Sequence, residues 1–323
     1  MGPKGRTLRE DAAAVVAAAH GGRGLRDPVP QPARRRGDNR RKLRDGRRDG
    51  RHVRLPVEPG AAQPGGVGVG VGNAVITVDD TADLDDAATK IHLSKTLDLA
   101  ASCSSDNSVI LVDAIYEPML ERLKAKGGYL CTSEEKEKLR NTIWDEAGHL
   151  NTAIVAQPAQ KIADMAGLTV PGDTEFYIVI EEGWGADFPF SGEKLSVVMA
   201  LYRANDIDHA IALTNNIQSY QGQGHSCGIY SNSDENIMKL ADATRTSRVM
   251  VNQPQAASNS GNLWNGMRQT FSLGCGSWGG NGTNNNISWR DLINETWISK
   301  PLTQPKELVS DEVLFGDVMT KLG

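Results

Sequence analysis

Residues 101–112 read Ala-Ser-Cys-Ser-Ser-Asp-Asn-Ser-Val-Ile-Leu-Val, and this stretch says most about the fold. It begins as a loop of small and polar residues and ends in an uninterrupted apolar run. Such a run is typical of a strand that is buried on both faces of a parallel sheet. Cys103 therefore stands on a loop that a rigid element holds, which is where nucleophiles often lie. A small buried cysteine without reactivity is the alternative interpretation.

Strand and helix patterns alternate around this stretch. Apolar runs predict strands at residues 75–78, 109–112, 176–180, 196–202, 227–230 and 248–251. Helical spacing predicts helices at 84–99, 115–126, 207–217 and 235–243, and Thr132 with Glu135 resembles a capping box that opens a further helix through 143. The alternation predicts the α/β fold class.

The overall charge of −5 averages two unlike pieces. Residues 1–60 hold 14 Arg and 2 Lys against 7 acidic residues, whereas the rest of the chain holds 19 basic and 33 acidic residues. The front piece also lacks aromatic residues and is dominated by Arg, Gly, Ala, Pro and Asp. We expect residues 1–65 to be a disordered basic segment, because they cannot bury enough apolar surface to offset their chain entropy.

This front segment has three interpretations. It could be a basic arm that binds polyanions, a plain solvated tail, or a GC-rich coding region translated out of frame. The third is favoured, because Arg outnumbers Lys 14 to 2 here and not in the remainder of the chain. Nucleic acid is not favoured as a partner, since no aromatic residue is interleaved for base stacking.

The spacing of the four cysteines bears on the cellular compartment of the protein and on whether it binds a metal. Cys103, Cys131, Cys227 and Cys275 are far apart, with no CxxC pair and no histidine cluster at metal-ligand spacing. We therefore expect reduced thiols, a cytoplasmic protein and no metal. No apolar stretch approaches the roughly 18 residues that span a bilayer, and no signal peptide is recognisable, so we expect no membrane partner.

Five motifs in one order resemble the CoA-acylating branch of the aldehyde dehydrogenase family, from about Gly66 to the C-terminus. They are residues 68–73, residues 102–110, residues 192–196 with 199–204, residues 224–227, and the glycine-rich segment 273–281. The resemblance implies an aldehyde dehydrogenase catalytic domain over 66–285, then a C-terminal oligomerisation strand and tail over 286–323. Residues 294–299 and 312–317 are similar to sulfoacetaldehyde dehydrogenases of that branch.

The resemblance implies a covalent mechanism. Cys103 would add to an aldehyde and, after hydride loss to NAD or NADP, hold the acyl group as a thioester that coenzyme A removes. His225 matches a histidine that could assist proton transfer, and Glu193 matches the glutamate that holds the nicotinamide ribose, with Gly72 beside the cofactor. Cys275 is interpreted as a packing residue.

The same family implies how the acyl group leaves and what surrounds it. Hydrolytic relatives carry a general-base glutamate where Val69 stands, and no acidic residue lies between Pro64 and Val78. Without such a base, a thiol rather than water is expected to receive the acyl group. Asn262, Trp264, Asn265 and Arg268 are expected to line the acyl pocket, with Arg268 facing an anionic substrate.

The chain also departs from the family. No segment before Gly66 matches the Rossmann-like cofactor domain, so this domain is expected to be largely absent and the activity of the chain alone to be impaired. Two classes of function remain. One is an acylating aldehyde dehydrogenase, in which an activated Cys103 would alkylate faster than the other thiols. The other is a non-catalytic protein that assembles with a full-length paralogue or binds polyanions through its basic arm. As assembly partners we expect further copies of the chain, in a homo-oligomer, or a full-length paralogue.

Overall fold

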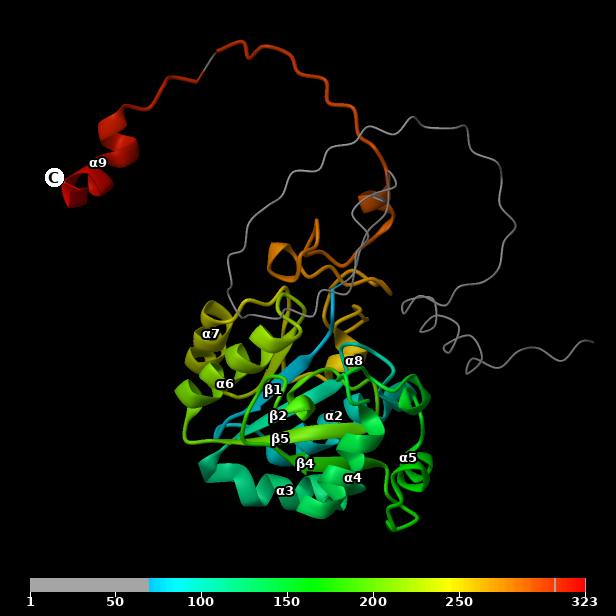
Figure 1. Ribbon diagram of the computed structural model, residues 1–323. Coiled ribbons are helices and arrows are strands. Elements are labelled where there is room, and N and C mark those ends of the chain that lie inside the picture. Colours follow the sequence, from blue (N-terminus) through cyan, green and yellow to red (C-terminus); the bar gives the residue numbers. More distant parts are fainter. Residues whose placement is uncertain (1–69, 305, 323) are drawn as a thin grey trace, which may run out of the picture. The chain divides into compact units, whose positions relative to one another are not determined.

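The computed structural model describes residues 70–304 and 306–322 (Figure 1). The expectations for residues 1–65 and for Val69 therefore fall outside the described residues. The chain forms two units, one that ends at Ser288 and one that begins at Trp289.

A parallel sheet of seven strands forms the centre of the first unit (Figure 1). Its order is β3-β4-β5-β2-β1-β6-β7, and every neighbouring pair is parallel. The α/β prediction is confirmed. The strands are β1 (Ala74–Val78), β2 (Asp106–Val112), β3 (Gly128–Leu130), β4 (Phe176–Ile180), β5 (Val198–Ala204), β6 (Cys227–Tyr230) and β7 (Val249–Val251).

Helices cover both faces of the sheet, as parallel connections require. α2, α3 and α8 gather on one side, where α2 contacts both of the others, while α6 packs on β1, β2 and β5 and also contacts α7. The helices of this unit are α2 (Leu84–Thr96), α3 (Tyr116–Ala125), α4 (Ser133–Ile143), α5 (Ala159–Ala166), α6 (Ile207–Tyr220), α7 (Asp234–Ala243) and α8 (Gln255–Ser258). Its short 3₁₀ turns are η1 (Leu97–Ala100), η2 (Asp113–Ile115), η3 (Thr152–Ile154), η4 (Pro189–Ser191) and η5 (Ser277–Gly279).

Most element predictions hold, and the differences have local causes. The predicted helix 84–99 ends at Thr96, because Asp98 and Leu99 adopt left-handed backbone angles. β2 begins at Asp106 rather than Val109, since the three polar residues before the apolar run are buried as strand residues. β3 and α5 had no recognised pattern: one is three residues long and the other is a single short amphipathic helix.

The second unit holds η6 (Trp289–Leu292) and α9 (Asp311–Leu322). Many of its apolar side chains are exposed, with Trp297 at 90% and Ile298 at 84%. No strand lies among its described residues, so a strand formed by pairing with another chain stays a prediction. Within the described part of the chain, no helix is long and apolar enough to cross a membrane.

Candidate active site

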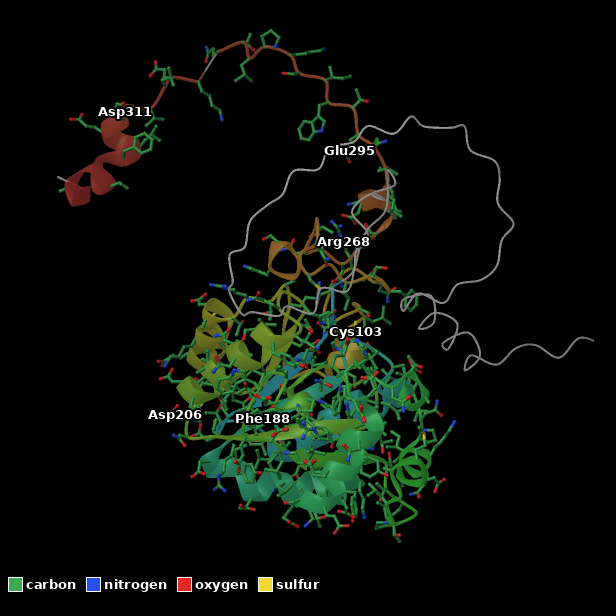
Figure 2. All side chains as sticks on the ribbon, in the orientation of Figure 1. Cys103, Phe188, Asp206, Arg268, Glu295 and Asp311 are labelled. Carbon is green, nitrogen blue, oxygen red and sulfur yellow. The ribbon has the colours of Figure 1, made fainter. Side chains whose placement is uncertain are left out.

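The predicted site residues meet at the amino edge of the sheet. Gly72 precedes β1, Cys103 precedes β2, Glu193 precedes β5 and His225 precedes β6. These strands are adjacent in the order β5-β2-β1-β6. Because neighbouring parallel strands begin at the same edge, residues that are far apart in the sequence come together here. Figure 2 labels Cys103 at this edge, and Asp206 follows the carboxyl end of β5.

Cys103 and His225 form a hydrogen-bonded pair. Nε2 of His225 lies 3.1 Å from Sγ of Cys103, and Nδ1 of the same ring lies 2.8 Å from Oγ of Ser226. When Nδ1 donates to Ser226, Nε2 is free to accept the thiol proton. The geometry is that of a nucleophile with a base whose second nitrogen is held by a neighbour.

Burial keeps both members of this pair neutral. Burial, then the charges of Glu193 and Cys275, raises the pKa of the Cys103 thiol to about 12. Burial, with a smaller contribution from Arg248, lowers the pKa of His225 to about 3. The resting state in this structure is a thiol beside a neutral imidazole, and the thiolate forms only as a proton leaves. Faster alkylation of Cys103 than of the other thiols stays a prediction.

Gly72 and Glu193 lie against Cys103. A Cβ on Gly72 would stand 2.5 Å from both Cβ and the carbonyl oxygen of Cys103 and 2.6 Å from Oε1 of Glu193. Only glycine fits between these groups. Oε1 of Glu193 is buried without a hydrogen-bond partner, and burial raises the pKa of this carboxyl to about 8.

Two asparagines tie the entrances of three strands together. Nδ2 of Asn107 donates to Oδ1 of Asn73 and to the carbonyl of Gly192, the latter at 2.6 Å. Nδ2 of Asn73 donates to the carbonyls of Ser191 at 2.8 Å and Gln221 at 3.0 Å. These bonds satisfy main-chain carbonyls that the sheet leaves unpaired, and they explain why an asparagine precedes β1 and another opens β2.

Lys194 holds the loop that carries Glu193. Its buried Nζ donates to the carbonyls of Phe190 at 2.5 Å and Gly192 at 3.0 Å. Burial lowers its pKa well below the usual range. Lys194 stands within one of the five motifs, but its position predicted no role for it, because a lysine before a strand ordinarily faces solvent.

The glycine-rich segment packs against Gly224, the residue before His225. A Cβ on Gly224 would lie 2.0 Å from the carbonyl oxygen of Cys275, and Gly224 has a φ of +84°. This is a close backbone approach in a conformation that only glycine adopts readily. Cys275 is buried, and Asn281 accepts from its main-chain N–H at 2.8 Å. Its position fits the packing role expected of it, although that role stays a prediction.

The residues expected to line the acyl pocket lie in a loop after α8. Nδ2 of Asn262 donates to the carbonyl of Ala257, while its Oδ1 accepts from the main chain of Trp264, so this amide organises the loop itself. Asn265 donates to the carbonyl of Ser258. Trp264 and Arg268 are exposed. The pocket assignment stays a prediction.

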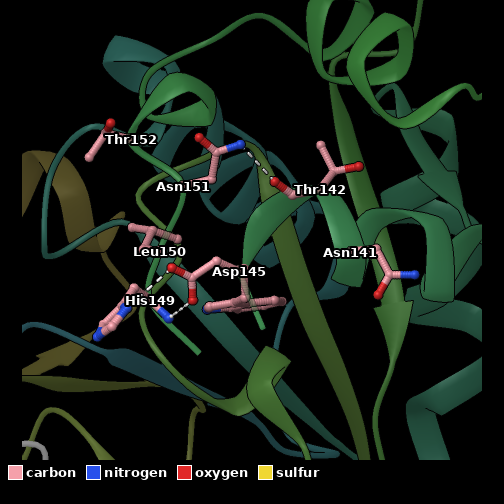
Figure 3. Close-up of a pocket in the computed structure, with 8 residues that line it drawn as sticks. Asn141, Thr142, Asp145, His149, Leu150, Asn151 and Thr152 are labelled. Carbon is pink, nitrogen blue, oxygen red and sulfur yellow. Dashed lines mark hydrogen bonds and ion pairs between the residues drawn. The ribbon is translucent and has the colours of Figure 1, made fainter. Parts of the chain in front are cut away.

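An open hollow of about 380 Å³ lies elsewhere at the surface (Figure 3). It is lined by eight residues between Asn141 and Thr152, including Trp144, Asp145 and His149. Its size suits a small ligand. However, Cys103 and His225 do not line it, so it is not the place where the predicted chemistry would occur. No group of His, Cys, Asp or Glu able to hold a metal occurs within residues 70–304 and 306–322.

The fold and this cysteine site define a class of protein. Residues 190–287 match the model of the aldehyde dehydrogenase family. The chain shares the fold of an acetylating aldehyde dehydrogenase from Geobacillus thermoglucosidasius, with a TM-score of 0.71 and 30% identity over 75% of this chain and 53% of that one. A probable aldehyde dehydrogenase from Listeria monocytogenes gives a TM-score of 0.71 at 33% identity, over 74% of this chain and 52% of that one.

Sequence comparison indicates the branch. The chain is 42% identical to the acylating sulfoacetaldehyde dehydrogenase of Cupriavidus necator, over 79% of this chain and 52% of that protein. It is 40% identical to the corresponding enzyme of Bilophila wadsworthia, over 79% and 56%. The resemblance to the acylating aldehyde dehydrogenases is therefore confirmed over the matched part of the chain. The chain spans about half the length of these curated relatives.

Proposed function

We propose that this site oxidises an aldehyde to an acyl group on Cys103 and transfers it to coenzyme A. The observation that carries the proposal is the 3.1 Å contact between Nε2 of His225 and Sγ of Cys103. In the forward direction, the sulfur of Cys103 would bond to the aldehyde carbon while its proton passes to His225 and the C=O π pair moves to the oxygen. That oxygen re-forms the double bond when the carbon gives up its hydride to a nicotinamide acceptor, which leaves a thioester on Cys103. The coenzyme A sulfur would then bond to the acyl carbon as the bond from that carbon to Cys103 breaks, and the coenzyme A thiol proton would return to Cys103.

The position of Glu193 supports a nicotinamide cofactor. Its Oε1 is a buried acceptor without a partner next to the nucleophile, and a ribose hydroxyl is a donor that would satisfy it. The nicotinamide ring supplies the hydride acceptor when bound. Gly72 lies against both Cys103 and Glu193, where any side chain would collide with the nucleophile and with this carboxyl. NAD and NADP both fit this proposal.

The protonation of Glu193 supports transfer to a thiol rather than to water. A carboxyl with a pKa of about 8 is mostly protonated at neutral pH, so only a minor fraction of the molecules holds the carboxylate that could activate water. Without a strong base, water attacks a thioester slowly. Sulfoacetaldehyde is the substrate that we favour, because the enzymes from Cupriavidus necator and Bilophila wadsworthia bear that name.

Acyl transfer from acetyl-CoA to Cys103 tests the proposal without a nicotinamide. The purified full chain is incubated with acetyl-CoA, and intact mass followed by peptide mapping locates any acetyl group. We expect an acetyl thioester on Cys103 that added coenzyme A reverses. Cys103→Ser should abolish the reversible adduct, whereas Cys131→Ser should leave it unchanged, because Cys131 lies on the loop before α4, away from His225.

Two results would reject this assignment. One is a chain that acquires no acetyl group on Cys103, and the other is a Cys103→Ser chain that still forms the reversible adduct. A second arm adds aldehyde, coenzyme A and NAD or NADP and follows reduction of the cofactor. Because the sequence predicts impairment, we expect this rate to be low for the chain alone.

The proposal also includes assembly with another chain through the second unit and a cytoplasmic location. Exposed apolar side chains in the second unit suit a segment that a second copy or a longer paralogue covers. The four cysteines carry no disulfide in the structure, which suits the predicted cytoplasmic location. A purely non-catalytic assembly protein is not favoured, because the relatives are named as enzymes.

A further inference from the structure

Arg248 is a buried cation beside the candidate site. It lies immediately before β7 and is 5% exposed. Arginine is rarely buried this far unless a carboxylate pairs with it. Among the described residues, its hydrogen-bond partners are neutral oxygens, and its Nε is buried without a partner. Burying a guanidinium without a carboxylate partner is unfavourable, so the position of Arg248 needs a physical explanation.

The guanidinium fastens His225 to the glycine-rich segment. Nη2 donates to the carbonyl of His225 at 3.0 Å and to the carbonyl of Gly274 at 2.7 Å. Nη1 donates to the carbonyl of Asn284 and to Oδ1 of Asn286, both at 3.3 Å. The planar fork of arginine can serve several acceptors at once, which lysine cannot do. The main chain that carries the imidazole is thereby fixed.

The charge of Arg248 also acts on the reacting groups. It lowers the pKa of Cys103 against the raising effects of burial, Glu193 and Cys275. It adds to the effect of burial in lowering the pKa of His225. The ionisable groups that face the pair are therefore Glu193 and Cys275 with one sign and Arg248 with the other. A thiolate that forms here gains stabilisation from Arg248, whereas the same charge disfavours the protonated imidazole and keeps the resting His225 neutral.

We propose that Arg248 is a positioning residue for the Cys103–His225 pair, holding the main chain of His225 in place and supplying a buried positive charge to the developing thiolate. The inference rests on the proposed function only in taking Cys103 as the nucleophile. It assigns to Arg248 no contact with substrate.

Alkylation of Cys103 measures this role without turnover. The full chain reacts with iodoacetamide between pH 7 and pH 10, and peptide mass spectrometry follows the rate at Cys103. Arg248→Gln removes the charge but keeps a polar side chain, and Arg248→Lys keeps the charge but loses the fork. Arg203→Gln is the matched control, because Arg203 is exposed and pairs with Asp113 at the other edge of the sheet.

The expected results differ in sign from those of a merely structural role. We expect Arg248→Gln to slow alkylation about tenfold at pH 8 and to move the pH profile upward, since one pKa unit changes the thiolate fraction tenfold. Arg248→Lys should remain within about threefold of the unchanged chain, and Arg203→Gln should match it. A structural role alone predicts faster alkylation, because a loosened loop exposes a thiol of ordinary pKa.

Circular dichroism establishes that each variant is folded. A folded Arg248→Gln chain that alkylates at an equal or higher rate overturns the inference. If that variant does not fold, Arg248→Lys decides: slowing beyond tenfold, or acceleration, in a folded chain overturns it. Failure of acetyl transfer to Cys103 in the unchanged chain would reject the proposed function instead, so the two failures remain distinct.

Discussion

Asp79 and Asp106 are both buried aspartates, one directly after β1 and the other at the start of β2. At the carboxyl edge of the sheet, Oδ1 of Asp79 accepts two bonds from Thr81, and Oδ2 accepts from Ser231 and Asn236. At the amino edge, Oδ1 of Asp106 accepts from Ser94 at 2.8 Å while Oδ2 has no partner. One edge satisfies its buried charge, and the other does not.

The same contrast extends to the backbone and to the other polar groups. Leu99, Ala100 and Leu195 have φ values of +53°, +59° and +45° and precede strands at the amino edge, whereas at the carboxyl edge Asn252 has a φ of +50° directly after β7. Oε1 of Glu193 and Nε of Arg248 are unpartnered there as well. Strain and unsatisfied groups concentrate at functional sites because the rest of the fold compensates for them. The amino edge is therefore suited to chemistry and the carboxyl edge to stability.

Gly72→Ala should have the largest effect on activity and stability, because it adds a methyl group where Cys103 and Glu193 leave no room for one. The new methyl group would overlap Cys103 and Glu193, so we expect acetyl transfer to fall at least about a hundredfold and the free energy of unfolding to fall by about 3 kcal/mol. Adduct formation and urea unfolding measure both. Gly282→Ala, where a Cβ meets nothing within 4 Å, is the control. Equal behaviour of the two variants would contradict the geometry.

Asp79→Asn compared with Asp106→Asn tests the two edges directly. The amide introduced by Asp79→Asn would turn a donor toward the donors that the carboxylate now satisfies, and we expect a loss of about 3 kcal/mol in unfolding free energy. Asp106→Asn should cost about 1 kcal/mol or less, because Oδ2 has no partner to lose. Chemical denaturation of both variants gives the values. A larger loss at Asp106 would reverse the comparison.

The free energy of unfolding should change with pH because Asp106 titrates differently in the folded and unfolded chains. Burial raises its pKa from 3.8 to about 7, against the lowering effects of Ser94 and Lys95. Since the folded chain holds this proton more tightly than the unfolded chain, its contribution is full below about pH 4 and is lost as the pH rises toward 7. We expect the unchanged chain to lose about 4 kcal/mol relative to Asp106→Asn over that interval, at about 1.36 kcal/mol per pKa unit. Parallel curves for the two proteins would be the contrary result.

Lys95 should act in the opposite direction at higher pH. Burial lowers its pKa from 10.5 to about 7, and Asp106 opposes this change. The contribution of Lys95 to stability is therefore lost as the pH falls from about 10 toward 7. Comparison of Lys95→Met with the unchanged chain over this range isolates the effect.

Asp98→Gly should give the smallest change and should be stabilising. Asp98 is exposed with φ +48° and ψ +33°, a conformation that costs other residues more than glycine. We expect a gain of about 0.5 kcal/mol, because relief of the strain exceeds the entropic cost of glycine. Asp86→Gly within α2 should instead lose about 0.5 kcal/mol. Thermal unfolding of both measures the difference, and a destabilised Asp98→Gly chain would argue against strain in this turn.

The apolar runs of the sequence placed most strands, including β1, β2, β4 and β6, and the family resemblance selected Cys103, Glu193, Gly72 and His225 as candidate site residues. In the structure each of these four residues precedes a strand. Arg248 escaped notice because an arginine before a short strand gives no sequence signal. Nor does sequence show that Asn262 uses its amide on its own loop, which leaves its pocket role unsupported by geometry.

Local pattern by itself determined most of the strands and helices, though not β3 and α5, since burial on two faces demands continuous apolar runs and helices demand their own spacing. Only the tertiary structure decided the strand order, and that order brings the entrances of β5, β2, β1 and β6 together at one edge. The protonation of Cys103, His225 and Glu193 was likewise undecided until packing removed water from them. Desolvation depends on neighbours that are distant in the chain, and a linear pattern carries no record of them.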